Sequence, residues 1–474
     1  MCSGPIVPKL IVYAVPLIIS GYLQLLFNAA DMAIVGQFGS NGAHSLAAVG
    51  ATSSLINLVL NVFIGMAVGA NAVVARRIGA GDKQGVSRAV HTAVLLGIVS
   101  GIIVMIVGLC LAKDLLLLMK TPADLIDLSV LYLRVYFLGA PFLMFYNFGS
   151  AILRAVGDTR KPMYFLITSG VLNVILNLIF VIVFHLDVAG VALATVLSQV
   201  LSAVLVFISL IRHSGDIKLF PSKIRLHKNE FLQIIQIGIP AGIQSSMFSI
   251  SNMIVQSSIN FFGTATIAAC SAASSIEGFV YIGMNCFYQT VLSFVSQNFG
   301  RHDFDRIKKI IVRSVLLVVI TGLFIGTIVM TFNETLIGLY LPDNAGNKAE
   351  LLNIALQRNM VVVWPYFLCG IMEVFVGSLR AMGQSLIPML ASMFGVCGGR
   401  MLWIFTVFEH FKYGSGVEIF GLNLTPLQIL MFAWPVAWIF TSTIHLITLV
   451  FELRKHRRKT ECINNIKVIN SINK

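Results

Sequence analysis

The apolar positions of this 474-residue chain fall in long, unbroken runs. Residues 95–112 read LLGIVSGIIVMIVGLCLA, and residues 313–330 read RSVLLVVITGLFIGTIVM. A membrane-spanning strand would alternate apolar and polar residues over about 10 positions, whereas a spanning helix needs about 20 mostly apolar residues. The pattern therefore predicts about twelve transmembrane helices, at 10–38, 46–73, 87–111, 128–156, 163–185, 188–212, 231–262, 266–296, 307–332, 357–382, 387–409 and 426–453.

The composition agrees with this pattern. Hydrophobic residues make up 57% of the chain and charged residues only 11%, against about 25% in a typical soluble protein. Twelve spans with short loops leave no room for a large soluble domain. The first apolar run, 10–38, lacks a basic start and a small-residue cleavage site, so we interpret it as a span and not as a signal peptide.

Basic residues are distributed unevenly between the loops. The chain has 33 Lys and Arg and a formal net charge of +13. When the flanking helix ends are counted with the loops, twenty-six of them fall at the N-terminus, near the loops after even-numbered spans or in the C-terminal tail, and six fall on the opposite side. Arg400 alone lies in the interior of a predicted span. The positive-inside rule then predicts a multi-pass protein of the plasma (inner) membrane with both termini in the cytoplasm. The basic tail is interpreted as a topology and lipid-headgroup feature, and nucleic acid is not expected as a partner.

The two halves of the chain repeat one design. A constant shift of 224 residues aligns YAVPLIISGYLQLLFNAADMAIVGQFG (13–39) with IGIPAGIQSSMFSISNMIVQSSINFFG (237–263). Further along, AILRAVGDTRKP (151–162) falls on GSLRAMGQSLIP (377–388). A single matched pair is weak, but the same order of Pro, Gly and Arg over about 200 residues indicates an internal repeat.

The repeat predicts the domain organisation. Because the shift covers six spans, both halves have the same orientation, related by an axis along the membrane normal. We expect an all-α integral membrane protein of two pseudo-symmetric six-helix lobes, with a substrate site between them near mid-membrane. The predicted parts are an N-terminal lobe at 1–212, a cytoplasmic linker at 213–230, a C-terminal lobe at 231–453 and a basic cytoplasmic tail at 454–474.

Several segments together resemble the multidrug and toxic compound extrusion (MATE) family. They are GQFG (36–39) with LAAVG (46–50), ANAVVARRIGAGD (70–82), LRAVGDTRKP (153–162), LNVILNLIFVIVFHLDVAGVALATVLSQ (172–199), SFVSQNFG (293–300) and LRAMGQSLIP (379–388). The resemblance covers roughly residues 8–455. It implies secondary active export of small amphipathic organic cations through a cavity that alternates between the two membrane faces. Entry of H+ or Na+ would drive this export, with no other cofactor, and a monomer is expected.

The N-terminal lobe carries the predicted ion-coupling residues. Charge inside a membrane is costly, so Asp31 in the first span is a functional candidate, and it matches the first-span aspartate that the family uses for cation coupling. The alternative is a packing role through a hydrogen bond to a neighbouring helix. Asn173 and Asn177 match a polar pair in the fifth span of the DinF branch, where the second position is commonly Asp, and Thr195 matches a nearby hydroxyl. An amide cannot titrate, so Asp31 would carry a proton alone or share a sodium ion with amide oxygens.

The branch of the family is predicted from what the other lobe lacks. The NorM branch places its cation-site acids at positions that fall here near Phe248 and Cys369, neither of which can usefully ligate sodium. The chain therefore resembles the DinF-like branch more closely than the NorM-like branch.

Two interpretations remain open for the charged residues of the C-terminal lobe. Glu373 could pair with Arg400 as a structural ion pair, or Glu277 and Glu373 could face a cavity and attract a cationic substrate. Amides are unusually frequent in the spans, which favours a hydrated cavity. The predicted cavity or substrate residues are Gln24, Asn28, Glu277, Tyr281, Glu373 and Arg400.

The sequence contains no motif that predicts an enzyme. It has neither GxxxxGK[ST] for a nucleotide nor HExxH for zinc, and its seven cysteines form no CxxC pair, so no metal site is expected. The leading hypothesis is an ion-coupled antiporter for drugs, relevant to antibiotic resistance. A flippase for lipid-linked oligosaccharides or lipids is the first alternative, although such proteins generally have extra spans and a more cationic cavity. A membrane scaffold or receptor is the second.

Overall fold

The computed structural model describes residues 1–39, 42–119, 121–340, 348–414, 416–419 and 422–472. The chain is 88% helical, as the sequence predicts. It forms two compact units, one of Ile11–Ser246 and one of Met1–Leu10 with Met247–Lys474. Ser246 and Met247 are consecutive residues of one helix, α8, so this helix contributes to both units. The lobe limits at 212 and 230 stay a prediction.

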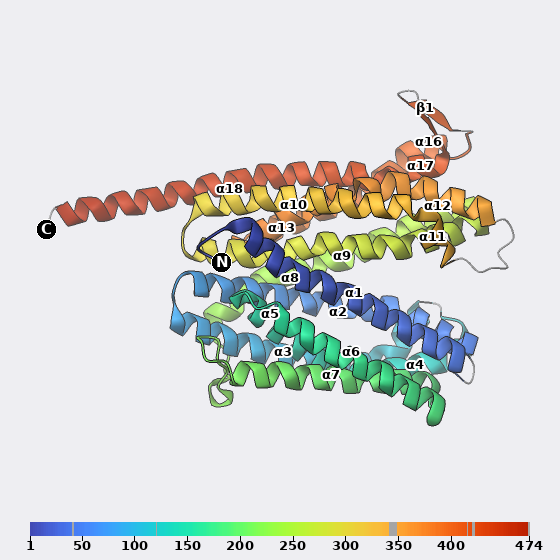
Figure 1. Cartoon of the computed structure of the whole chain (residues 1–474), viewed down its shortest axis with the longest axis horizontal. Helices are drawn as coiled ribbons and strands as arrows, with labels where there is room; N and C mark the ends of the chain where they lie inside the picture. The colour runs from blue at the N-terminus through green and yellow to red at the C-terminus, as the bar shows by residue number, and fades with distance from the viewer. Residues whose placement is uncertain (40–41, 120, 341–347, 415, 420–421, 473–474) are drawn as a thin grey trace. The chain divides into compact units, whose positions relative to one another are not determined.

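The unit of Ile11–Ser246 is built from seven α-helices and the first half of an eighth among its described residues. Within it, α3 packs along α2, α4 and α5, and α6 packs along α7 (Figure 1). The helices are α1 (Ile6–Phe38), α2 (Gly42–Gly79), α3 (Lys83–Leu118), α4 (Ala123–Leu138), α5 (Ala140–Val156), α6 (Arg160–Leu178), the π-helix η1 (Ile179–Val183), α7 (Asp187–Ile211), the short 3₁₀-helix η2 (Pro221–Lys223) and α8 (Lys228–Ile259).

The unit of Met247–Lys474 contains more helix breaks. Within it, α9 packs along α10, α12 and α13, and α13 packs along α18 (Figure 1). Its further elements are η3 (Asn260–Phe262), α9 (Thr264–Gly300), α10 (Phe304–Thr331), α11 (Asn333–Gly338), α12 (Lys348–Val362), η4 (Trp364–Tyr366), α13 (Phe367–Ala381), α14 (Leu386–Ser392), η5 (Met393–Gly398), α15 (Gly399–Trp403), η6 (Ile404–Phe408), α16 (Glu409–Phe411), strands β1 (Val417–Ile419) and β2 (Leu422–Leu424), α17 (Pro426–Met431) and α18 (Ala433–Ile472).

Ten helices of the described residues are long and apolar enough to cross a membrane, and a bent pair adds an eleventh. The bent pair corrects the continuous helix predicted at 128–156, because the chain turns by 47° at Gly139 between α4 and α5. The remaining predicted span is α8, whose 32 residues form a helix but carry many Ser, Asn and Gln. The prediction of about twelve spans is confirmed to this extent.

Several predicted boundaries are wrong. The helix predicted from residue 357 begins already at Lys348 and breaks at Pro365, where the backbone leaves helical geometry. The helix predicted to end at 453 continues as α18 to Ile472, so most of the predicted tail is helical. Residues 473–474 of that tail lie outside the described residues. An antiparallel hairpin of β1 and β2, which the sequence analysis did not predict, precedes α17.

The repeated LRAxG segments form the same local structure in each unit. The N–H of Gly157 donates to the carbonyl of Arg154 at 3.0 Å, and the N–H of Gly383 donates to that of Arg380 at 2.9 Å. Both glycines have positive φ, of 108° and 91°, which closes the helix C-terminus at low cost only for glycine. The repeat in sequence is therefore a repeated helix stop, at the ends of α5 and α13.

Two GxxxG segments bring α2 and α8 into backbone contact. A Cβ added to Gly65 would lie 2.3 Å from the nitrogen of Gly242, and one added to Gly69 would lie 2.3 Å from the carbonyl oxygen of Ile234. On the other side, a Cβ on Gly238 would lie 2.5 Å from the Cα of Met66. Small residues let membrane helices approach closely and gain dispersion energy that lipid contact does not provide. The first half of α8 is thereby fixed against α2.

Candidate functional site

Asp31 lies at one end of a chain of hydrogen bonds that joins α1, α6 and α7. Asn177 Nδ2 donates to Asp31 Oδ1 at 2.5 Å and to Asn173 Oδ1 at 3.3 Å. Asn173 Nδ2 donates to Thr195 Oγ1 at 3.4 Å, and that hydroxyl donates to the carbonyl of Val191 at 3.0 Å. The structure therefore brings together all four residues that the sequence predicts for ion coupling. We call them the Asp31 group.

The local structure of α6 explains how its two asparagines reach this group. Asn173 and Asn177 are four residues apart, so both side chains lie on one face of the helix. Both are buried, and the side-chain oxygen Oδ1 of Asn177 is buried without a hydrogen-bond partner in the described structure. Two residues after Asn177 the helix widens into the π-helix η1, a distortion that is frequent at functional sites. An unused amide oxygen beside a carboxylate is a suitable ligand for a cation.

Two tyrosines that the sequence did not assign to this group lie near it. Tyr132 and Tyr136 of α4 stack with ring centroids 6.1 Å apart, and both lie within electrostatic range of Asp31. Their spacing of four residues on one helix was the available signal.

Gln24 and Asn28 are exposed on α1. In the described part of the chain no hydrogen bond joins either side chain to the Asp31 group. They precede Asp31 by seven and three residues, so the three side chains follow one face of the helix. Their predicted role in a cavity stays a prediction.

Glu277 forms the main ion pair among the spans of the other unit. Its Oε2 accepts from Arg358 Nη2 at 2.5 Å, and its Oε1 accepts from the hydroxyl of Tyr366 at 3.2 Å. Arg358 Nη2 also donates to Ser274 Oγ at 3.1 Å. These contacts join α9 to α12 and η4.

Arg358 corrects the prediction that Arg400 is the lone basic residue inside a span. Arg358 is only 2% exposed and lies in Lys348–Ala381, one of the helices able to cross a membrane. The sequence analysis placed it at the outer end of the span predicted at 357–382, and the segment before it, KAELLNIALQRN, is rich in polar residues. Burial against α9, with Glu277 as counter-charge, compensates for the low hydropathy of that segment.

The structure does not pair Glu373 with Arg400. Glu373 on α13 is 6% exposed and makes no ion pair or hydrogen bond with a described residue. Arg400 on α15 is 5% exposed; its Nη1 donates to Asn252 Oδ1 at 2.9 Å, and its guanidinium lies 4.8 Å from the ring centroid of Trp434. The described part of the structure thus contains no ion pair between these two residues, and their predicted role in a cavity stays a prediction.

Tyr281 lies one helical turn after Glu277 on α9 and is 39% exposed. Its hydroxyl accepts a hydrogen bond from Asn285 Nδ2 at 3.3 Å, and Gln289 Nε2 donates to Asn285 Oδ1 at the same distance. Tyr281 also lies within electrostatic range of Glu373. These polar side chains form a partly exposed row on one face of α9.

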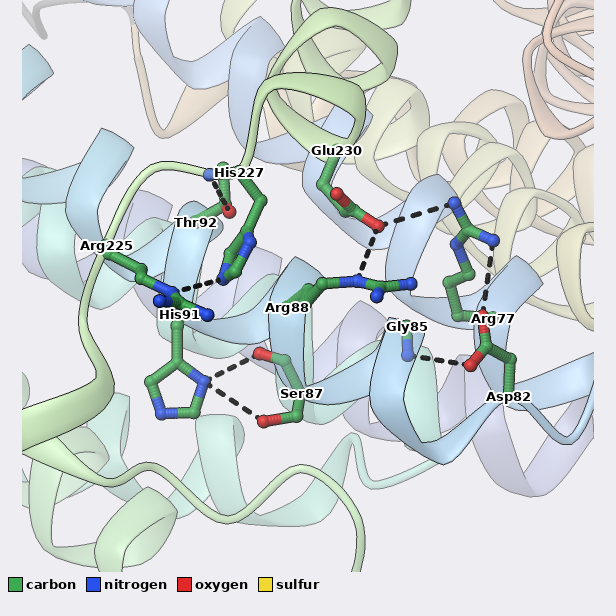
Figure 2. Close-up of polar contacts among 10 residues, drawn as sticks. All are labelled: Arg77, Asp82, Gly85, Ser87, Arg88, His91, Thr92, Arg225, His227 and Glu230. Atoms are coloured by element: carbon green, nitrogen blue, oxygen red, sulfur yellow. Dashed lines mark hydrogen bonds and ion pairs between the residues drawn. The ribbon is translucent and has the colours of Figure 1, made fainter.

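A further buried carboxylate, Glu230, lies at the start of α8. Figure 2 shows it between two arginines, with Oε1 3.4 Å from Arg77 Nη2 and 3.3 Å from Arg88 Nε. Arg77 in turn contacts Asp82, whose side chain accepts from the N–H of Gly85 and caps α3. The sequence analysis counted both arginines only as loop charges and assigned no role to Glu230.

The segment before Glu230 is held to α3 by main-chain hydrogen bonds. The N–H of His227 donates to Thr92 Oγ1 at 3.2 Å (Figure 2), and the N–H of Phe220 donates to His91 Nε2 at 3.1 Å. The rings of His91 and Phe220 also stack, with centroids 6.4 Å apart. These contacts fix the connection between α7 and α8 against α3.

Comparison with known proteins gives the family. The model of the MatE family matches residues 16–179 and 240–404, which together are more than half of the chain. This chain belongs to the MatE family. The two matched segments begin 224 residues apart, at Pro16 and Pro240, which is the spacing of the internal repeat. The family and the apolar helices together make the chain a multi-pass membrane transporter.

Named relatives and solved structures agree with this assignment. The chain is 26% identical over 417 residues to the probable multidrug resistance protein YoeA of Bacillus subtilis (strain 168), with 86% of this chain and 88% of that protein covered. It is 24% identical over 372 residues to the multidrug export protein MepA of Staphylococcus saprophyticus, covering 78% and 81%. The structure titled as the outward-facing conformation of a multidrug resistance MATE family transporter of the MOP superfamily matches with a TM-score of 0.85 at 19% identity, covering 96% of this chain and 97% of that one. This last likeness shows the fold alone.

Proposed function

We propose that this chain exports amphipathic organic cations across the plasma membrane in exchange for protons or sodium ions, by alternating access, with both termini in the cytoplasm. The names of its relatives, multidrug resistance and multidrug export proteins, support drugs as substrates. They do not favour the flippase alternative.

The observation that carries the proposal is the environment of Asp31. Its carboxylate lies in a helix able to cross a membrane and accepts a hydrogen bond from a neutral amide, and no basic side chain pairs with it among the described residues. An uncompensated charge in such a place is costly, so binding of H+ or Na+ is favourable. Protonation converts one carboxylate oxygen into a donor, which cannot face the Nδ2 donor of Asn177. Protonation of Oδ1 would require the amide to rotate, whereas protonation of Oδ2 leaves this hydrogen bond in place but weaker, because the acceptor has lost its charge. In both cases the charge of Asp31 affects its hydrogen bond to α6.

We infer that the coupling ion is a proton and that the chain is closer to the DinF-like branch. A single carboxylate neutralised by a single proton requires no further acid, whereas Asn177 stands where a second acid is commonly found in that branch. A sodium ion would need the oxygens of Asn173, Asn177 and Thr195 to turn toward Asp31. The Oδ1 of Asn177, which has no partner, is the readiest of these.

The first experiment measures ethidium efflux from a pump-deficient host that expresses the wild-type chain or Asp31→Asn. We expect efflux by wild type and loss of it in Asp31→Asn, because the amide cannot be protonated. Asp114→Asn, the same chemical change at an exposed position of α3, is the matched control and should behave as wild type. Equal efflux by Asp31→Asn and wild type would overturn the coupling role of Asp31.

The second experiment identifies the ion. Purified protein in proteoliposomes is supplied with a proton gradient or with a sodium gradient, and ethidium uptake is measured in each case. We expect transport with the proton gradient alone. Transport that needs sodium would overturn proton coupling while leaving export itself intact.

A further inference from the structure

The connection between α7 and α8 holds one aromatic ring between two lysines. Lys218 Nζ lies 5.4 Å and Lys223 Nζ lies 4.8 Å from the ring centroid of Phe220, a residue that is 40% exposed. In the described part of the chain neither ammonium group makes an ion pair, whereas Lys161 is paired with Asp158 at 3.4 Å. Two unpaired positive charges thus converge on one ring. We call Lys218, Phe220 and Lys223 the linker patch.

The backbone that carries the linker patch is fixed to the helices on both sides. Ile217 and Leu219 are each 1% exposed and anchor the segment in the core. The N–H of Leu219 donates to the carbonyl of Leu210 at 3.1 Å, and the N–H of Phe220 donates to His91 Nε2 at 3.1 Å. The patch is therefore presented by an ordered backbone, which loses little conformational entropy when a ligand binds.

The contact with His91 places the linker patch at the depth of lipid headgroups. His91 lies four residues before the apolar run 95–112 of α3. At about 1.5 Å per residue this run is about 27 Å long, close to the thickness of about 30 Å of a bilayer's hydrocarbon core. His91 is therefore about one helical turn outside the hydrocarbon, and Phe220, which is bonded to it, lies at the same level. Aromatic and basic side chains are typical of this layer.

The segment around the linker patch is strongly basic. Glu230 is buried and already bound by Arg77 and Arg88, so it does not neutralise the exposed charges (Figure 2). Between residues 212 and 228 the one acidic residue is Asp216. Leu226, which is 50% exposed, adds a second apolar side chain to the segment. The exposed basic residues of this segment are Arg212, Lys218, Lys223, Arg225 and Lys228. Basic residues beside apolar ones at a membrane surface attract anionic lipids.

We propose that the linker patch binds the headgroup of an anionic phospholipid. The phosphate lies between the ammonium groups of Lys218 and Lys223, where it removes the repulsion between two like charges. The glycerol backbone and the upper part of an acyl chain pack on Phe220 and Leu226. The proposal assigns a partner to a surface that plays no part in the proposed export, and it does not depend on that function.

The test measures hydrogen exchange of the linker patch in lipid nanodiscs. The full-length protein is reconstituted in phosphatidylcholine alone or in an equal mixture of phosphatidylcholine and phosphatidylglycerol. Mass spectrometry then follows the peptides that cover residues 214–228. We expect phosphatidylglycerol to slow their exchange several-fold in wild type, because a bound headgroup covers the segment. The turn between α9 and α10, residues 301–303, reports any general effect of an anionic surface on exchange.

Three variants separate charge, apolar contact and general electrostatics. Lys218→Gln/Lys223→Gln should lose most of the slowing by phosphatidylglycerol. Lys308→Gln/Lys309→Gln removes the same charge from two exposed lysines of α10 and should keep the slowing in full. Phe220→Ser retains both lysines and the backbone N–H, and its slowing should be smaller than that of wild type. Exchange like that of wild type in phosphatidylcholine shows that each variant is folded.

The outcomes identify the partner. No slowing in wild type, or equal slowing in wild type and Lys218→Gln/Lys223→Gln, would overturn the lipid site. Soluble glycerol 3-phosphate, added to phosphatidylcholine nanodiscs, should have no effect, because it lacks the acyl chains that pack on Phe220. If it slowed exchange as much as phosphatidylglycerol does, the patch would bind free phosphate compounds and the lipid assignment would be wrong. Ethidium efflux tests export separately, so failure of either proposal leaves the other standing.

Discussion

Arg358 Nη2 donates to Glu277 Oε2 at 2.5 Å, and this buried ion pair joins α12 to α9. The two side chains are only 3% and 16% exposed. Taking both charges out of water is costly, and their mutual attraction repays that cost only while both partners are present. The pair therefore constrains the two helices in a way that neither charge alone can.

Arg358→Met should destabilise the protein strongly, because it leaves Glu277 buried without a counter-charge. Removal of one partner of a buried pair typically costs about 3–5 kcal/mol. The double variant Arg358→Met/Glu277→Gln should recover part of the loss. Thermal unfolding of the purified protein measures both effects. Glu409→Gln, which removes the exposed partner of Lys412, is the control and should change little. A double variant less stable than Arg358→Met would contradict the argument.

Gly65→Ala should destabilise the contact between α2 and α8. The added Cβ would lie 2.3 Å from the backbone nitrogen of Gly242, and backbone atoms cannot yield as a flexible side chain can. The cost expected for such overpacking is about 1–3 kcal/mol, seen as a lower unfolding temperature. Gly50→Ala, on the same helix with no atom within 4 Å of the new Cβ, is the matched control. Equal unfolding temperatures for the two variants would rule out close packing at Gly65.

Glu230→Gln should release the connection between α7 and α8. The neutral amide holds Arg77 and Arg88 more weakly, and the start of α8 is then less firmly placed. We expect trypsin to cleave several-fold faster at Lys218, Lys223 and Arg225 in the native protein. Asp216→Asn, a neutralisation at an exposed position of the same connection, should leave the rate unchanged. An unchanged rate in Glu230→Gln would mean that the main-chain hydrogen bonds to α3 suffice.

Asn177→Asp should introduce sodium dependence. The new carboxylate would lie at hydrogen-bonding distance from Asp31, and two like charges so close together repel unless a cation binds between them. We expect sodium to stimulate ethidium transport several-fold in Asn177→Asp proteoliposomes and to have no effect on wild type. Asn147→Asp, whose amide bonds only within α5, is the control for an added acid in a span. Sodium stimulation of wild type would contradict the proton assignment. A lack of stimulation in Asn177→Asp would contradict the argument that two carboxylates at this position hold a sodium ion.

The Asp31 group could be predicted because its members follow simple rules. Asp31 is an isolated charge in an apolar run, Asn173 and Asn177 share one helix face, and the family resemblance supplied the pairing between helices. The spans were also predictable, since each needs a long apolar run. What the sequence could not supply was the distance between α1 and α6, which depends on packing along both helices.

The burial of Arg358 inside a span was missed because mean hydropathy is calculated from the residues of one segment alone. In α12 the charged residues are tolerated where another helix supplies a counter-charge, as Glu277 does. The bend at Gly139 and the π-helices around Arg400 were missed for a related reason. They depend on how neighbouring helices pack against these segments, and no local residue pattern marks them. The GxxxG segments of α2 and α8 were visible in the sequence, but not that they face each other.

The hydrogen bonds of Arg306 set a condition on biosynthesis. Its Nη2 donates at 3.0 Å to the carbonyls of Ser3 and Gly4, residues that leave the ribosome about 300 positions earlier. The N-terminal segment of a nascent chain must therefore wait undocked until α10 is made. The first half of α8, in contrast, can pack on α2 as soon as it is made, because α2 precedes it in the chain and is already in the membrane. The N-terminal segment therefore docks late and the contact between α2 and α8 forms early. The order of the chain thus sets the order of assembly.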